Sequence, residues 1–196
     1  MEDEAFYQIN HTEKFKRLYE VLFETKKIPS VLPFVTKRIT EKEFVKYLNF
    51  LISYKKDGFG DLFFNYLLKE LEIRGEFKIN RTSREMPSHN RADLVVECNN
   101  LNTFIFEFKL DGYVESEDQT HNHVSRFEKN FPNHKPFYFF IDSKGEKARN
   151  EKFSNFDLKP FKFVVKKMIN EISSEADILS LNIFLEVLND LQQRAE

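Results

Sequence analysis

RADLVVECNNLNTFIFEFKL, from Arg91 to Leu110, is the stretch that decides the fold. Two apolar runs stand on either side of Asn99 and Asn100, and this pattern is typical of two strands joined by a turn. Because side chains alternate between the two faces of a strand, one face of this hairpin is wholly apolar. The opposite face gathers charged side chains at one end, namely Asp93, Glu107 and Lys109.

The two acids of this hairpin are predicted to face each other. With a loop at residues 99–101, the register places Asp93 directly opposite Glu107, and opposed side chains in a sheet have Cβ atoms only ~5 Å apart. Two carboxylates at that distance repel each other unless a cation lies between them or one keeps its proton. The alternative is a pair of solvated acids on an open sheet face. Val95 and Ile105 lie beside them and favour a partly covered face, where unpaired acids would be costly.

Length and composition narrow the class of protein. The chain has 196 residues, which suits one domain with a sizeable core. Its formal net charge is −2, so any nucleic-acid site must be a local patch. The single cysteine, Cys98, lies on the apolar face and is predicted to be an inert buried thiol in a reducing, cytoplasmic setting. No apolar run is long enough to span a membrane, and the acidic N-terminus lacks a signal-peptide pattern.

Apolar spacing along the rest of the chain predicts the other elements. The N-terminal part shows a helix over 11–26 and a second that begins at Thr40, where Glu43 completes a capping box. Asp61 is predicted as the N-cap of a third helix. The remaining predictions are strands at 76–81 and 137–141, a helix at 116–130, a charged loop at 144–157, a strand or helix start at 161–165, and helices at 166–173 and 180–194.

This element order predicts an α/β or α+β fold with a mixed central sheet, the hairpin at its centre and helices on both faces. The segment from Glu107 to Ile141 is predicted as strand–helix–strand and fits a crossover to a parallel neighbour. We expect a single domain over 1–196, made of an N-terminal helical part (1–54), a core that holds the hairpin (55–145), and a C-terminal strand and helices (146–196).

The charged end of the hairpin supplies groups for metal-assisted phosphodiester cleavage. Carboxylate oxygens suit a hard cation, and Mg²⁺ takes one or two of them together with waters and substrate phosphate. We expect Asp93 and Glu107 to bind Mg²⁺, with Mn²⁺ as a substitute, and the Phe108 carbonyl to be a third ligand. The metal would polarise the phosphate and lower the pKa of a bound water. Lys109 would orient or deprotonate that water, or offset charge on the phosphorane.

Asp93 is followed by thirteen residues and then by Glu107-Phe108-Lys109. This spacing resembles the signature of the PD-(D/E)xK nuclease superfamily, in which the acid and the E-x-K lie on adjacent strands. The resemblance to a largely uncharacterised bacterial branch extends over residues 55–145, through 58–68, Arg84-Glu85, Arg91, Gln119 and the strand 137–141. It implies a restriction-endonuclease-like mixed sheet, with extra N-terminal and C-terminal helices, and a Mg²⁺-dependent DNA nuclease.

Five residues near this motif carry secondary predictions. Gln119 either organises the site or contacts solvent, and Glu85 either completes the metal site or caps a strand end. Asp61 is predicted as a helix cap, with metal binding as the alternative. Arg84 and Arg91 precede the key acid and are candidates for phosphate contacts in nucleic acid.

Three positions depart from the pattern of that branch, one of them near the start of the glycine-rich helix, where Gly58-Phe59 stand in place of a common histidine. Ala92 stands where a proline is common, and His123 stands where a tyrosine often follows the glutamine by four residues. His121 and His123 do not predict a zinc site, because residues two apart on a helix point to different faces and metal pairs use i, i+4 spacing.

Three functions from different classes are open at this point. The first is a Mg²⁺-dependent nuclease acting on DNA, with a role in defence or in a mobile element. The second is a nuclease-fold module that binds nucleic acid or a protein partner without cutting. The acidic pI of about 6.3 is compatible with this alternative. The third is a structural subunit whose terminal helices build an oligomer; a homodimer would also suit paired cuts on both strands.

Overall fold

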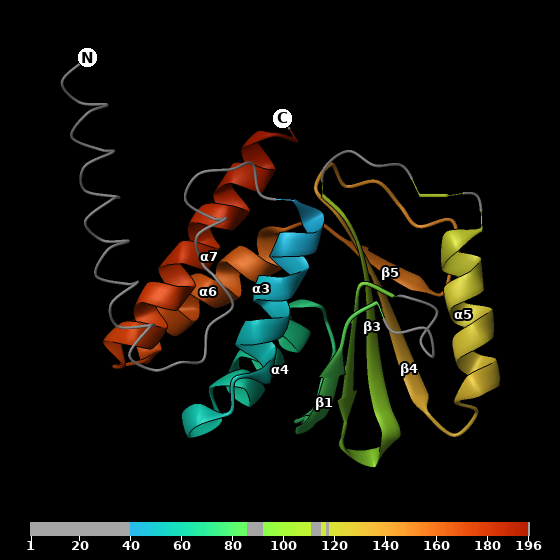
Figure 1. Cartoon of the computed structure of the whole chain (residues 1–196), viewed down its shortest axis with the longest axis horizontal. Helices are drawn as coiled ribbons and strands as arrows, with labels where there is room; N and C mark the ends of the chain where they lie inside the picture. Colours follow the sequence, from blue (N-terminus) through green and yellow to red (C-terminus); the bar gives the residue numbers. More distant parts are fainter. Residues whose placement is uncertain (1–39, 86–91, 111–114, 117, 196) are drawn as a thin grey trace.

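The computed structural model of the protein describes residues 40–85, 92–110, 115–116 and 118–195, which contain a five-stranded mixed sheet with helices on both faces (Figure 1). The strands follow one another across the sheet in chain order. The first three are antiparallel neighbours, whereas the third, fourth and fifth are parallel. Their bounds are Ile79–Ser83 (β1), Leu94–Cys98 (β2), Asn102–Lys109 (β3), Lys135–Asp142 (β4) and Phe153–Phe156 (β5).

The hairpin of β2 and β3 has the register that its sequence predicts. Leu94 pairs with Phe106, and the loop between the strands is Asn99–Leu101. That loop is a 3₁₀ turn in which Asn100 adopts a left-handed φ of 54°, a conformation that asparagine tolerates better than most residues. β3 then pairs in parallel with β4, and the connection carries one helix, so the predicted crossover is confirmed.

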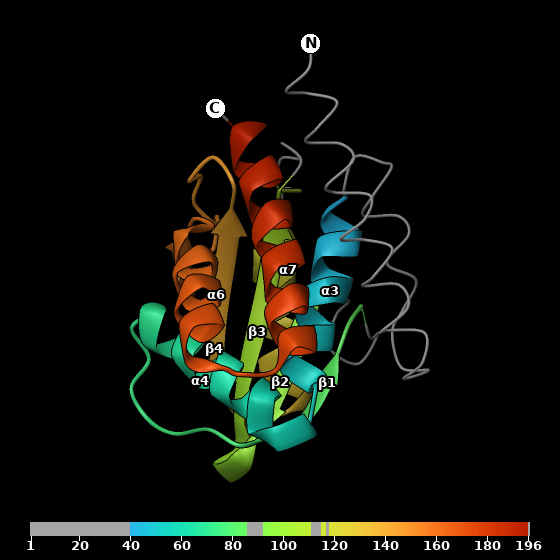
Figure 2. The same ribbon diagram turned by 90° about the vertical axis from the view of Figure 1, so that its left-hand side faces the viewer.

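The larger helical layer covers one face of the sheet (Figure 2). It packs on the apolar face of the hairpin, where the Phe64 and Phe104 rings meet edge-to-face with centroids 5.2 Å apart. The first helix of this layer begins as predicted, because Thr40 and Glu43 form the reciprocal hydrogen bonds of a capping box. The layer consists of Glu41–Ser53 (α3), Phe59–Glu70 (α4), Lys159–Glu171 (α6) and Glu175–Gln193 (α7).

The start of α4 corrects the prediction for Asp61. The helix begins at Phe59, after Gly58 in a left-handed conformation with φ 73°, so Asp61 lies in the first turn rather than at the cap. Its Oδ1 instead accepts a hydrogen bond of 2.8 Å from the backbone N–H of Ile79, at the start of β1. Only glycine fits at position 60, because a Cβ there would overlap the backbone carbonyl of Ile52 in α3.

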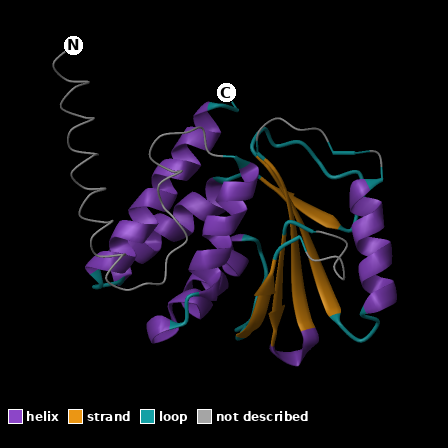
Figure 3. Ribbon diagram, in the orientation of Figure 1, coloured by secondary structure: helices purple, strands orange, loops and turns teal. Residues whose placement is uncertain are grey.

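A single described helix, Gln119–Asn130 (α5), covers the opposite face of the sheet (Figure 3). It starts three residues later than the predicted 116. Its Val124 and Phe127 pack on Val95, Ile105 and neighbouring apolar side chains of the sheet. Glu107 and Lys109 alternate with the buried aromatic residues of β3 and so face this side of the sheet.

Three sequence predictions are settled or corrected in detail. Of the two alternatives for 161–165, the helix is correct: the segment lies inside α6, where Phe161, Val164 and Met168 recur at helical spacing and are buried. A short apolar run cannot distinguish a strand from a buried helix segment by spacing alone. The predicted charged loop contains β5, which is only four residues long with two exposed residues in its middle. The predicted strand at 76–81 is displaced to Ile79–Ser83.

Some predictions fall on residues that the structure does not describe. They are the helix at 11–26 and the phosphate contact from Arg91. Among the described residues, no helix combines the length and the hydropathy needed to cross a bilayer.

Candidate functional site

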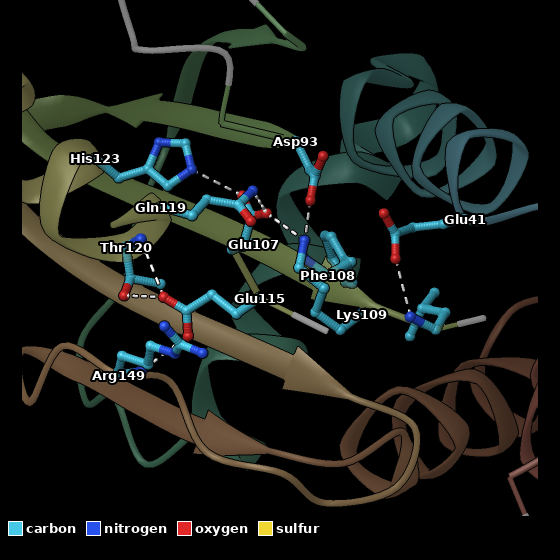
Figure 4. A network of polar contacts seen from close by, with 11 residues as sticks. Glu41, Asp93, Glu107, Phe108, Lys109, Glu115, Gln119, Thr120, His123 and Arg149 are labelled. Carbon is cyan, nitrogen blue, oxygen red and sulfur yellow. Dashed lines mark hydrogen bonds and ion pairs between the residues drawn. The ribbon is translucent and has the colours of Figure 1, made fainter. Parts of the chain in front are cut away.

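The charged side chains at the end of the hairpin lie on the face of the sheet that α5 covers (Figure 4). Asp93 immediately precedes β2, and the register that pairs Leu94 with Phe106 runs on toward Asp93 and Glu107. The Glu107 side chain is 1% exposed and that of Lys109 is 8% exposed. The charged groups that the sequence places at one end of one face are therefore close together and largely removed from water.

The Glu107 carboxylate is held by three side chains. Lys109 Nζ lies 2.6 Å from Oε1, and Gln119 also donates to Oε1. His123 Nε2 lies 3.0 Å from the other oxygen, Oε2, which is an ion-pair distance without hydrogen-bond geometry. Burial opposes ionisation, but the His123 contact and the Lys109 charge outweigh it and hold the pKa of Glu107 below its usual value. Glu107 is therefore a buried carboxylate that keeps its charge at neutral pH.

Asp93 shows the opposite behaviour. Its Oδ2 accepts a hydrogen bond of 2.8 Å from the backbone N–H of Phe108. Burial raises the pKa of Asp93 to about 8, and the negative charge of Glu107 adds to this effect. In the protein without a bound cation, the pair of acids therefore retains one proton at neutral pH.

β3 extends beyond Leu94, the first residue of β2. The backbone N–H groups along this open edge donate to acidic side chains. The N–H of Phe108 donates to Asp93, and the N–H of Leu110 donates to Glu41 Oε2 at 2.9 Å. The N–H and C=O of one residue point to the same side of a strand in an antiparallel pair. The Phe108 carbonyl therefore faces the same side as the Asp93 carboxylate. By contrast, the Lys109 carbonyl faces β4, where it accepts the N–H of Ser143 at 3.1 Å.

Glu41 is a third acid of this site that the sequence analysis did not single out. It lies in the first turn of α3, where an acid is ordinarily explained by the helix dipole. Its negative charge contributes to the raised pKa of Asp93 and to that of Lys109. No spacing rule links it to the hairpin, because more than fifty residues separate Glu41 from Asp93 in the sequence.

Gln119 and His123 come from one face of α5. They are four residues apart, so they lie one turn from each other on the helix. The structure resolves the prediction for Gln119 in favour of contact with the site, since it donates to Glu107. His123 was treated only as a departure from a pattern, although its i, i+4 spacing from Gln119 pointed to the same face. His121 is exposed and lies on another face of the helix from His123, which is buried.

A small cavity of about 50 Å³ opens beside Asp93. Its lining includes Arg84, the described candidate for phosphate contact, and Glu85. The Glu85 side chain is 52% exposed and pairs with Lys42 at 3.2 Å. Glu85 therefore borders the site with a surface ion pair and makes no described bond to Asp93 or Glu107.

Asp61 lies outside the site, which corrects its prediction as a possible metal ligand. Its bond to Ile79 places it beside Cys98, at the end of β2 far from Asp93. Burial raises the pKa of Cys98 to about 12, and the Asp61 charge adds to this rise. This agrees with the prediction of an inert thiol.

The donors at the hairpin end fit Mg²⁺ in chemical type. Among the described residues, no group of three or more His, Cys, Asp or Glu side chains is arranged so that it could hold a metal ion. Mg²⁺ does not need such a group, because it commonly takes one or two protein carboxylates and completes its shell with water and phosphate oxygens. Asp93, Glu107 and the Phe108 carbonyl offer only oxygens, the atoms that a hard cation prefers.

Comparisons with known proteins add no relative. A scan against family models, a search of curated proteins and a search of solved structures each returned no match.

Proposed function

We propose that this chain is a Mg²⁺-dependent nuclease that hydrolyses phosphodiester bonds in DNA, on a restriction-endonuclease-like fold. One observation carries the proposal: Asp93 and Glu107 share a buried hairpin end with Lys109, and their pKa values are shifted in opposite directions. Strongly perturbed acids gathered at one place are typical of functional sites. The mixed sheet with helices on both faces is compatible with the proposed fold.

Asp93, Glu107 and the Phe108 carbonyl would hold the cation, with Glu41 nearby on the same open strand edge. Bound Mg²⁺ would polarise the phosphate and lower the pKa of a water molecule. Asp93 must release its proton to serve as a ligand, so its raised pKa predicts competition between protons and the cation. Glu107 needs no such change, because it is already charged.

Lys109 acts as a fixed positive charge in this proposal. Burial alone would lower its pKa, but the adjacent Glu107 carboxylate reverses the effect and holds the pKa of Lys109 above its usual value. A lysine that keeps its proton is a poor base. Its role is therefore to orient the attacking water and to stabilise negative charge on the phosphorane.

Gln119 and His123 contact different oxygens of the Glu107 carboxylate, Oε1 and Oε2 respectively, and so fix its orientation. Arg84 lines the cavity beside Asp93, and this position supports its proposed role in contacting a DNA phosphate. Such contacts position the substrate but carry no sequence information.

The experiment that tests this proposal is cleavage of DNA and RNA substrates with Mg²⁺, with Mn²⁺ and with EDTA. We expect cleavage of DNA that requires either cation and is lost in Glu107→Gln and Lys109→Ala. Glu128→Gln is the matched control, since Glu128 is exposed on α5 and pairs with Lys152 at 2.7 Å. Cleavage that survives in both site variants, or the absence of any cleavage by the wild type, contradicts the proposal.

A second candidate is a nuclease-fold module that binds nucleic acid or a protein partner without cutting. The observation that favours it is the crowding of the Glu107 carboxylate by protein groups: Oε1 accepts from Lys109 and Gln119, and Oε2 lies 3.0 Å from His123 Nε2. A cation would have to compete with these donors. Calorimetric titration with Mg²⁺ and Mn²⁺, with and without DNA, separates the two functions: DNA binding with no heat of cation binding supports the module.

A further inference from the structure

A second buried carboxylate, Glu115, lies four residues before the first residue of α5 and has no role in the site described above (Figure 4). Its Oε1 accepts the backbone N–H of Thr120 at 3.1 Å and also the Thr120 hydroxyl. Its Oε2 accepts the backbone N–H of Arg149 at 2.9 Å. Thr120 in turn accepts the N–H of Asn150 at 3.2 Å. These hydrogen bonds connect Glu115 to the first turn of α5 and to the loop between β4 and β5.

Glu115 does the work of a helix cap. The residue at the N-cap position of α5, Asp118, makes no capping hydrogen bond with its side chain. The first N–H groups of a helix have no partner within the helix and need one from outside. Glu115 supplies an acceptor for Thr120 in the first turn, and its negative charge suits the helix N-terminus. Without Glu115, the first turn of α5 would lose this acceptor and would be less stable.

This first turn carries Gln119, one of the two α5 side chains that contact the proposed catalytic acid, while the other, His123, lies one turn later. Gln119 is the first residue of the helix, and it donates to Glu107. The buried apolar contacts of α5 come from Val124 and Phe127, farther along the helix. In the first turn Thr120 is fully buried, and it exchanges hydrogen bonds with Glu115 and Asn150. The residue next to Gln119 is therefore fixed by polar bonds.

We propose that Glu115 is a positioning residue: through Thr120 it holds the first turn of α5 where Gln119 reaches the Glu107 carboxylate. The consequence for catalysis rests on the proposed nuclease function, whereas the positional effect does not. Glu115 contacts neither the proposed metal ligands nor Lys109 in the described structure, so it acts on the site only through α5.

α5 also offers a matched control. Its exposed Glu128 pairs with Lys152 through both carboxylate oxygens, at 2.7 and 3.0 Å. This second link joins the same helix to the same connection between β4 and β5, but nine residues beyond Gln119. Glu128→Gln therefore removes a helix-to-loop carboxylate without touching the first turn.

The test is the side-chain amide resonance of Gln119 in a ¹H–¹⁵N spectrum of the full chain, assigned by its loss in Gln119→Glu. Glu115→Gln keeps the side-chain size but turns an amide group toward one of its backbone donors, so we expect the Gln119 resonance to move. Thr120→Val should move it too, whereas Thr120→Ser, which keeps the hydroxyl, and Glu128→Gln should leave it in place. Thr120→Val decides the question if Glu115→Gln does not fold.

An unmoved Gln119 resonance in a folded Glu115→Gln or Thr120→Val protein overturns the proposal, as does an equal shift in Glu128→Gln. In the cleavage assay, Glu115→Gln should lower kcat by up to about 100-fold with little change in KM. Adding Gln119→Ala should cost little more, because both changes remove the same contact. A wild type that cleaves nothing defeats the proposed function, yet the resonance test of Glu115 still stands.

Discussion

The two faces of β3 are buried to nearly the same extent but in different ways. On one face the rings of Phe104, Phe106 and Phe108 are fully buried in the larger core. On the other face Glu107 and Lys109 are almost as deeply buried and are held in a polar network. Burial of the rings is favourable in itself, whereas burial of the charges is favourable only while each keeps its partners.

This difference indicates what each face is for. Replacing a buried ion pair by apolar residues of similar volume often leaves stability unchanged or increases it. The polar face of β3 therefore contributes little to the stability of the fold. The free-energy cost of burying these charges is explained if Glu107 and Lys109 take part in catalysis. The apolar face needs no such explanation. The following predictions are designed to separate the two faces, beginning with the largest expected effect.

Phe106→Ala should reduce the free energy of unfolding by about 3–5 kcal/mol, because it opens a cavity in the larger core. Chemical denaturation monitored by circular dichroism measures this change. The control is Phe163→Ala on α6, where the wild-type side chain is 54% exposed, and we expect a change of no more than about 0.5 kcal/mol. A loss below about 1 kcal/mol in Phe106→Ala contradicts the role assigned to the apolar face.

Glu107→Gln should cost about 3 kcal/mol, because it leaves the Lys109 ammonium buried beside an uncharged side chain. Adding Lys109→Met should restore most of this stability while DNA cleavage stays absent. The same denaturation experiment measures both variants. A double variant as unstable as Glu107→Gln alone would show that the polar face contributes to stability in its own right.

Asp93→Asn should become progressively more stable than the wild type as the pH rises. The raised pKa of Asp93, about 8 in the folded chain against 3.8 ordinarily, means that the folded state binds the proton more tightly. The wild type therefore loses stability progressively as the pH rises between these two values, because its unfolded state releases the proton first. Glu107, whose pKa is lowered, contributes stability that is lost only as the pH falls below its ordinary range. Denaturation midpoints that run parallel for both proteins across this range contradict the assignment.

Glu85→Gln should have the smallest effect. Its partner Lys42 is 62% exposed, and surface ion pairs of this kind contribute at most about 1 kcal/mol. We expect little change in unfolding and no loss of Mg²⁺-dependent cleavage. A large loss of cleavage in this variant would instead assign Glu85 to the metal, the alternative raised by its position before Asp93.

The hairpin shows how far local rules reach. The two-residue period of a strand, together with the loop at Asn99–Leu101, was enough to predict the register and the separation of the two faces. The capping box at Thr40 was equally local and is confirmed. These features depend on residues close together in sequence.

The failures involve contacts between distant segments. Glu41 reaches Leu110, and Glu115 reaches Arg149, only because segments distant in sequence are folded together, so no spacing in the sequence pointed to these contacts. Asp61 was predicted as a cap from its residue type, but the left-handed Gly58 starts the helix earlier. β5 is too short and too polar to show an apolar pattern.

The most direct test of the central claim is a crystal structure after soaking in Mn²⁺, with the ion located by its anomalous scattering. We predict one strong peak at the open edge of β3, about 2.1 Å from oxygens of Asp93, Glu107 and the Phe108 carbonyl. Asp93→Asn crystals, soaked in the same way, should show a weaker peak or none. No wild-type peak at this edge, or peaks only elsewhere on the molecule, would contradict the claim that the charged end of the hairpin is a cation-dependent catalytic site.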